Sequence, residues 1–271
     1  MLKNRDLMQR LIENVQIHIP FTMLYESYLD HFIENRFNPE IYFNSDALDK
    51  YSVADFNTVA EQLHQQGLMI TLHSPFWDLS PGSPDPAIRD LTKHRFDQTV
   101  QLVPIFKPKT IVCHAGYDWK RYGFMRDLWI ENSVETWTWF SEKIKNEGGH
   151  LMIENVYEHY PDDILMLLKK LGNENIGFCL DVGHQAVFSR SPIERWIKDL
   201  GQYLKQLHLH DNFGEYDDHL ALGDGNINFS KLFTSVRHLH NKPITITIEP
   251  HEEKDLFPSL EYLEKVWPWK M

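Results

Sequence analysis

The sequence predicts a parallel (β/α)8 barrel, and three observations support that prediction. Eight short apolar segments alternate with longer amphipathic segments, and no linker separates the units. The length of 271 residues is typical of this fold. A doubly wound open sheet is the alternative, but no glycine-rich phosphate-binding fingerprint follows the first apolar segment. We therefore expect a single barrel domain over residues 1–271.

The predicted elements follow from the spacing of apolar residues. Short apolar runs predict strands at 15–20, 40–44, 68–73, 109–114, 150–155, 176–181, 204–210 and 244–249. Apolar residues at i, i+3 and i+4 predict helices at 53–67, 88–106, 132–149, 161–172, 192–204, 229–240 and 256–267. Pro161 and Pro192 stand near helix starts, and Gly67, Gly148 and Gly172 near helix ends, as helix termini favour.

Composition restricts the class of protein. The net charge of −12, from 27 basic and 39 acidic residues, repels a nucleic-acid backbone unless metal or local basic patches offset it. Only Cys113 and Cys179 are present, without CxxC spacing, so a thiolate cluster is not expected and a cytoplasmic location fits. We expect no signal peptide and no membrane association, because the start of the chain and its apolar runs lack both signatures.

Six consecutive predicted strands, the third to the eighth, end in an imidazole or a carboxylate. Because the C-terminal strand ends of a barrel converge on one mouth, these side chains should meet there. They are His73, His114, Glu154, Asp181, His208 with His210, and Glu249. Carboxylates gathered so closely repel one another, and a divalent cation bound by carboxylate and imidazole removes that cost. A lone histidine at a strand end is more often a hydrogen-bonded core or rim residue than a ligand, and a lone glutamate there fits a salt bridge, so only the joint placement predicts a metal site.

Two later segments add candidate ligands and pocket residues. His184 follows Asp181 by three residues, and the DxH spacing of Asp217 and His219 lets both side chains reach one ion. His210, one pleat beyond His208, is a candidate substrate contact. Aromatic candidates for a pocket wall, with ordinary loop packing as the alternative, are Trp77, Tyr117, Phe76, Trp119 and Phe188.

Basic residues near the predicted mouth are few. Lys120, Arg121 and Arg190 are the best placed to bind a substrate phosphate, with a solvated surface charge as the alternative. The loops at 44–52 and 185–192 hold few basic residues, which argues against duplex DNA as a substrate. The remaining histidines, His18 and His251 among them, are assigned no role.

Motifs at these strand ends carry a family resemblance. They are HSPFWDLSPGS (73–83), IVCHAGYD (111–118), MIEN (152–155), CLDVGH (179–184), LHLHD (207–211), DDHLALGDGNI (217–227) and IEP (248–250). In order and spacing they resemble the xylose isomerase-like TIM-barrel superfamily, which includes sugar phosphate isomerases and epimerases and the endonuclease IV family (AP endonuclease family 2).

The resemblance implies a ligand set. Glu154, Asp181, His208 and Glu249 match the four ligands of a metal shared across the superfamily, and the spacing to the aspartate of LHLHD selects His208 over His210. The endonuclease IV pattern adds two ligands to one zinc and three to another. These are His73 and His114 for the first, and His184, Asp217 and His219 for the second.

Two activities fit these residues. The first is an isomerase or epimerase of a small sugar or sugar phosphate, in which one zinc, manganese, magnesium or cobalt ion acidifies a C–H and Glu154 and Glu249 transfer the proton. The second is an endonuclease IV-like phosphoester hydrolase with three zinc ions, acting on a small phosphoester or abasic-site DNA.

The two lines of reasoning favour different activities. The number of candidate ligands favours hydrolysis, and the frequency of sugar isomerases among similar barrels favours isomerisation, which is our first expectation. A non-catalytic metal-binding barrel is a third class, and the Glu154–Glu249 pair argues against it. The expected partner is a small carbohydrate or phosphorylated molecule, and the oligomeric state stays open.

Overall fold

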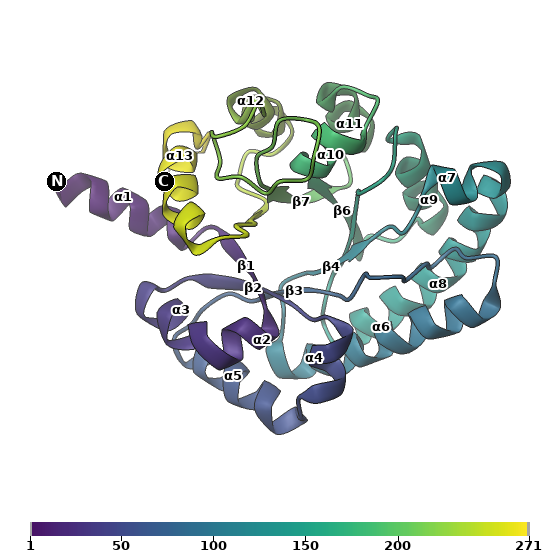
Figure 1. Cartoon of the computed structure of the whole chain (residues 1–271), viewed down its shortest axis with the longest axis horizontal. Helices are drawn as coiled ribbons and strands as arrows, with labels where there is room; N and C mark the ends of the chain where they lie inside the picture. Colours follow the sequence, from purple (N-terminus) through teal and green to yellow (C-terminus); the bar gives the residue numbers. More distant parts are fainter. Residues whose placement is uncertain (1, 270–271) are drawn as a thin grey trace.

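A computed structural model describes residues 2–269, with side chains from residue 7 onward. Its strands form a closed parallel barrel in the order β1 to β8, which confirms the predicted fold (Figure 1). Residues 1, 270 and 271, which the expected domain includes, lie outside the described part. The strands are β1 (Gln16–Pro20), β2 (Asn38–Tyr42), β3 (Thr71–His73), β4 (Ile111–His114), β5 (Leu151–Glu154), β6 (Ile176–Asp181), β7 (Leu204–Leu209) and β8 (Thr245–Ile248).

The second strand begins earlier than predicted, because a polar residue starts it. Asn38 is buried, and its amide nitrogen donates to the carbonyl of Val15 at 3.2 Å. Its side-chain oxygen accepts from the backbone N–H of Met69 at 2.8 Å. Asn38 thus joins the first three strands at the base of the barrel, a role that the apolar pattern from residue 40 did not indicate.

The helices surround the strands and match the predicted positions, with several additions. The additions are α1, the segment from α2 to α3, and the short helices that follow strand ends. In chain order the helices are α1 (Leu2–Ile12), α2 (Phe21–Met23), η1 (Leu24–Tyr28), α3 (Leu29–Asn35), α4 (Ser45–Lys50), α5 (Val53–Gln65), α6 (Pro86–Phe106), α7 (Trp119–Tyr122), η2 (Gly123–Met125), α8 (Arg126–Asn146), α9 (Asp162–Leu171), α10 (Val182–Phe188), α11 (Ile193–Leu200), α12 (Phe229–Leu239), η3 (Glu253–Asp255) and α13 (Leu256–Val266).

Local chemistry explains several helix boundaries. Ser52 and Asp55 form a capping box at the start of α5, in which each side chain accepts from the other's backbone N–H. Helix α8 begins six residues before the predicted start, because Trp129 and Ile130 already pack into the core. In the described residues, no helix is both long enough and apolar enough to cross a membrane.

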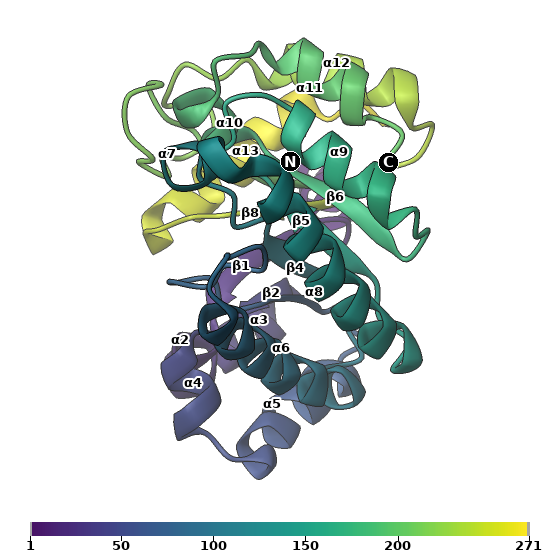
Figure 2. The same ribbon diagram turned by 90° about the vertical axis from the view of Figure 1, so that its right-hand side faces the viewer.

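Two different environments lie on the two sides of the strands. Between strands and helices the core is apolar and rich in aromatic rings, such as Phe96 stacked on Phe140 with centroids 4.4 Å apart. Inside the barrel the side chains are largely polar, and they include Glu40, Gln206 and His208. The short helices α2, α4, α7 and α10 all follow C-terminal strand ends and lie at one end of the barrel, on the left of Figure 2.

Candidate metal centre at the barrel mouth

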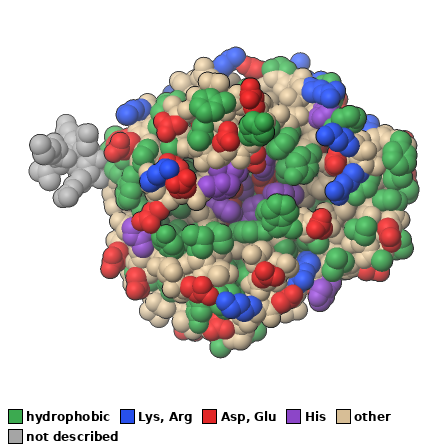
Figure 3. Space-filling view, viewed as in Figure 1, with side chains coloured by type: hydrophobic (Ala, Val, Ile, Leu, Met, Phe, Trp, Pro, Cys, Tyr) green, Lys and Arg blue, Asp and Glu red, His purple; other side chains and the backbone are tan. Residues whose placement is uncertain are grey.

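Histidine side chains gather in a hollow at the C-terminal ends of the strands, as Figure 3 shows. A cavity of about 920 Å³ opens there. Seven of the nine predicted ligands line it: His73, His114, Glu154, His184, Asp217, His219 and Glu249. The other two, Asp181 and His208, are fully buried beneath it. The fold therefore brings all nine predicted residues to one end of the barrel.

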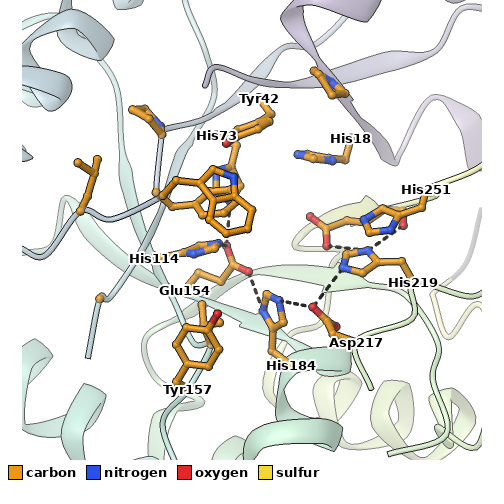
Figure 4. Close-up of a pocket in the computed structure, with 18 of the residues that line it drawn as sticks. His18, Tyr42, His73, His114, Glu154, Tyr157, His184, Asp217, His219 and His251 are labelled. Carbon is orange, nitrogen blue, oxygen red and sulfur yellow. Dashed lines mark hydrogen bonds and ion pairs between the residues drawn. The ribbon is translucent and has the colours of Figure 1, made fainter. Parts of the chain in front are cut away.

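Glu154, the last residue of β5, lies at the centre of this group (Figure 4). Its Oε2 is 3.1 Å from Nε2 of His73 and 3.6 Å from Nε2 of His114. Its Oε1 is 3.3 Å from Nδ1 of His184 and 3.5 Å from Nδ1 of His208. The same Nδ1 of His208 lies 3.0 Å from Oε1 of Glu249, so one imidazole faces both glutamates.

The DVGH motif positions two of these side chains. Asp181 caps helix α10, and its Oδ1 accepts from the backbone N–H of His184 at 2.6 Å. Gly183 between them packs against the ring of His210, where a Cβ would lie only 1.9 Å from Cε1. Asn155 of the MIEN motif joins β5 to β6 by accepting from the backbone N–H of Asp181 at 3.0 Å. The structure therefore explains two residues of the motif: Asp181 caps the helix, and position 183 has room only for glycine.

The loop after β7 carries Asp217 and His219 to the site. Asp211 organises it, because its buried carboxylate accepts from the backbone N–H groups of Gly223 at 2.9 Å and Ile227 at 3.1 Å. A Cβ on Gly225 would lie 2.4 Å from the same carboxylate, which explains the second glycine of the GDG segment.

His219 has a backbone φ of +50° and lies in a stack of imidazoles. Its ring centroid is 3.6 Å from that of His210 and 3.7 Å from that of His251. Its Nε2 lies 3.5 Å from Oδ2 of Asp217, and that oxygen is 3.3 Å from Nε2 of His184. Asp217, His219 and His184 are therefore close enough to contact the same bound ion or molecule.

Burial and charge together set the protonation of the site. Burial raises the pKa of Glu154, but the surrounding imidazoles, His208 first, outweigh it and hold that pKa well below its usual range. Burial lowers the pKa of His114 to about 3, which leaves its imidazole neutral. For His184, burial also lowers the pKa, but the carboxylate of Asp181 and its neighbours raise it well above the usual value. Ionised carboxylates at this depth attract a cation.

The donor atoms fit a divalent metal ion. Buried atoms with no hydrogen-bond partner among the described residues include Oδ2 of Asp181, Nδ1 of His208, Nδ1 of His210 and Oδ1 of Asp217. In a protein interior such atoms are rare, and a ligand is one explanation for them. Glu154, Asp181, Glu249 and His208 fall pairwise into four different groups of potential ligands, each with its ligand atoms within 4.8 Å of one another, and no such group among the described residues contains all four. Two atoms that bind one ion at about 2.0–2.2 Å lie at most about 4.4 Å apart, so small side-chain shifts would bring these atoms to one cation.

Other predicted site residues lie at different depths. Trp77, Tyr117 and Arg121 line the cavity, and Trp77 is 73% exposed at its rim. His210 is buried beneath the cavity, with Nε2 3.2 Å from Oδ1 of Asp181, rather than on its lining. Arg190 lies in a neighbouring depression, with its guanidinium carbon 5.4 Å from the ring centroid of Trp119.

Sequence reasoning missed three residues at this site. His18 and His251 were assigned no role, yet both line the cavity, and burial lowers the pKa of each to about 4. Glu40 was placed at the start of a strand, but it lies inside the barrel with Oε1 2.8 Å from Nε2 of His208. A period-two pattern through residues 38 to 42 could have pointed Glu40 inward.

The fold and this mouth define a (β/α)8 barrel with a histidine- and carboxylate-rich site at its C-terminal strand ends. Residues 33–266 match the family described as the xylose isomerase-like TIM barrel, and the chain belongs to that family. This confirms the resemblance predicted from the motifs. The uncharacterized protein MJ1311 of Methanocaldococcus jannaschii is 28% identical over 207 residues, which are 72% of this chain and 69% of MJ1311.

Solved structures with the same fold include several epimerases. The TTHB071 protein from Thermus thermophilus, soaked with ZnCl2, has a TM-score of 0.79 at 25% identity and covers 94% of this chain and 98% of its own. A D-tagatose 3-epimerase-like protein has a TM-score of 0.80 at 24% identity, covering 93% and 96%. The D-psicose 3-epimerase of Clostridium cellulolyticum H10, solved with D-tagatose, has a TM-score of 0.74 at 17% identity, covering 93% and 98%.

Proposed function

We propose that the protein is a divalent-metal-dependent isomerase or epimerase acting on a small sugar or sugar phosphate. The observation that carries this proposal is the pair Glu154 and Glu249, whose Oε1 atoms lie 3.5 Å and 3.0 Å from the same Nδ1 of His208. Glu154 ends β5 and Glu249 directly follows β8, three strands further around the barrel, so the two carboxylates approach one point below the cavity from different sides. Membership of the family and the epimerases among similar structures support the same reaction class.

In this proposal Glu154, Asp181, His208 and Glu249 hold the cation. Zinc, manganese, magnesium or cobalt bound there would acidify the C–H between the carbonyl and hydroxyl groups of a substrate. Burial raises the pKa of Glu249, but His208 outweighs it and holds that pKa well below its usual range, so the carboxylate is ionised, the state in which it binds a cation.

The remaining residues of the cavity bind and shield the substrate. His18 is neutral at pH 7 because its pKa is lowered to about 4 by burial, so its imidazole can donate and accept hydrogen bonds to hydroxyl groups. Trp77 and Tyr117 contribute aromatic surface that excludes water and packs on the apolar face of a sugar. Arg121 lies at the rim and is the candidate for binding a phosphate group.

Deuterium incorporation tests this proposal directly. Ketopentoses, ketohexoses and their phosphates are incubated in D2O with the protein and each of the four metals, and products are followed by NMR. We expect deuterium at the carbon that changes configuration or oxidation state in at least one substrate. Glu249→Gln should reduce that exchange about 10²- to 10⁴-fold, the range for loss of a general base. Absence of exchange across the panel, together with phosphoester cleavage, would reject the proposal.

A specific cluster supports hydrolysis as the second candidate. The ligand atoms of His184, His210, Asp217 and His219 all lie within 4.8 Å of one another, beyond what one cation at Glu154 requires. Three zinc ions would suit an endonuclease IV-like phosphoester hydrolase. The net charge of the protein is −12, and the basic residues in the described cavity lining are Lys120 and Arg121. So little positive charge favours a small phosphoester over abasic-site DNA as the substrate.

A further inference from the structure

We propose that Glu40, on β2 inside the barrel, is a positioning residue that orients His208 toward the cation. Its carboxylate accepts the Nε2 proton of His208 and so leaves Nδ1 as the ligand atom. This inference rests on the proposed function, because the cation is part of that function. Glu40 lies outside the four-ligand set, although its carboxylate lies within 4.8 Å of ligand atoms of both His208 and Glu249; its shortest contact with that set is the 2.8 Å from Oε1 to Nε2 of His208.

The two ring nitrogens of His208 face different surroundings. Nε2 lies 2.8 Å from Oε1 of Glu40, and Nδ1 lies 3.0 Å from Oε1 of Glu249 on the cavity side. Among the described residues, Oε1 of Glu40 and Nδ1 of His208 have no other well-aligned hydrogen-bond partner, so this contact is the one available to Oε1. The amide nitrogen of Gln206 is also 3.3 Å from Nε2, but its shorter contact is to Oε2 of Glu40, at 2.6 Å. A histidine that binds a metal ordinarily gives its other ring N–H to a carboxylate or carbonyl, which fixes the tautomer. Glu40 is the carboxylate in that position.

Three donors fix the orientation of the Glu40 carboxylate. Its Oε2 accepts from Oγ1 of Thr71 at 2.9 Å, Nε2 of Gln206 at 2.6 Å and Oγ1 of Thr247 at 3.0 Å. These donors come from β3, β7 and β8, so strands around the barrel hold one oxygen and leave Oε1 for His208. Because Oε2 already has three donors, the side chain cannot turn without losing them.

The cost of burying Glu40 points to a role beyond folding. The residue is 0% exposed, and removing a carboxylate from water costs several kcal/mol unless its partners compensate. An apolar side chain would fill the barrel interior without that cost. The Glu40 carboxylate instead gives His208 a strong hydrogen-bond acceptor on the side away from the cavity. A carboxylate that accepts the second ring N–H of a metal-binding histidine raises the basicity of that histidine.

Glu40→Gln is the variant that reverses this arrangement. The three donors would hold the glutamine oxygen where Oε2 now lies, so the NH2 group would face Nε2 of His208. Two donors would then meet, or the ring would carry its proton on Nδ1, the atom needed for the cation. Either result weakens metal binding. Thr71→Val is the matched control, because it removes one donor to Oε2 and leaves Oε1 beside His208.

The experiment measures metal affinity rather than turnover. Zn²⁺ is titrated into each variant in competition with a chromophoric chelator, and the visible absorption of the Co²⁺-loaded protein reports the ligand set. We expect Glu40→Gln to weaken Zn²⁺ binding about 10- to 100-fold and to change the Co²⁺ spectrum, with Thr71→Val within about threefold of the wild type.

Each outcome separates this inference from the proposed function. Wild-type affinity in Glu40→Gln would overturn the role of Glu40, and so would an equal loss in Thr71→Val. If Glu40→Gln fails to fold, Glu40→Asp keeps the charge but withdraws the oxygen from His208. Its Zn²⁺ affinity should then fall severalfold, and an unchanged affinity overturns the inference. If the wild type itself binds no cation, the proposed function fails instead.

Discussion

Replacing His219 with asparagine separates the two candidate reactions. The imidazole lies in the loop after β7, between the rings of His210 and His251 at 3.6 Å and 3.7 Å. Asparagine is the suitable replacement, because residue 219 has a φ of +50° and asparagine tolerates left-handed backbone better than alanine does. Loss of two ring contacts, each worth about 0.5–1.5 kcal/mol, should destabilise the fold by ~1–3 kcal/mol. For a chain of this length that lowers the Tm by about 2–5 °C.

The effect on turnover depends on whether His219 binds a cation. In a one-ion isomerase its contact with the site is a hydrogen bond from Nδ1 to the backbone carbonyl of Glu249, at 3.2 Å. Loss of one such bond is worth about 0.5–1.5 kcal/mol, so kcat/KM should fall no more than about tenfold. A hydrolase that needs His219 as a zinc ligand should instead lose about 100-fold or more.

The assay measures kcat/KM for deuterium exchange into the best ketose and, in parallel, zinc content per chain. Asp218→Asn is the matched control, because Asp218 is the exposed neighbour of the DxH pair and its replacement removes charge without removing a candidate ligand. We expect less than tenfold loss in His219→Asn and one retained cation. A loss above 100-fold, with a loss of bound zinc, would refute the one-ion account.

Two further predictions concern stability. A cation present at a concentration of 100 times its Kd should stabilise the fold by ~2.7 kcal/mol, so chelation with EDTA should lower the Tm by about 5 °C. A Tm that neither EDTA nor added metal changes would contradict a structured metal site. Burial raises the pKa of Glu158 to about 8 from its usual 4.5, so the folded state keeps a proton that the unfolded chain has lost between these values. The free energy of unfolding should therefore fall as pH rises from 4.5 to 8, by up to ~5 kcal/mol from this group, and Glu158→Gln should flatten that fall in urea titrations. Equal pH profiles for both proteins would show that Glu158 does not bind the extra proton.

The fold and the gathering of histidines and carboxylates at the barrel mouth could be predicted because their signals are local. Each strand from β3 to β8 ends in or beside a histidine or carboxylate, and barrel geometry alone carries those ends to one mouth. The segment from residue 21 to 35 was not predicted, because its π-helical turn at Leu24–Tyr28 interrupts the 3.6-residue period.

The residues that were missed depend on contacts between distant strands. The orientation of Glu40 is set by hydrogen bonds from Thr71, Gln206 and Thr247, which are up to 207 positions away in the sequence. His251 follows β8 and reaches the cavity through its stack on His219. The period-two pattern can point Glu40 inward, but a single sequence does not indicate which side chains it meets there, because the closure of the barrel brings them together.

Anomalous X-ray diffraction from crystals loaded with Mn²⁺ or Zn²⁺ tests the central claim most directly. We expect a divalent cation bound by carboxylate oxygens of Glu154, Asp181 and Glu249 and by Nδ1 of His208. Crystals loaded at saturating metal that show no anomalous peak among these four side chains would contradict the account.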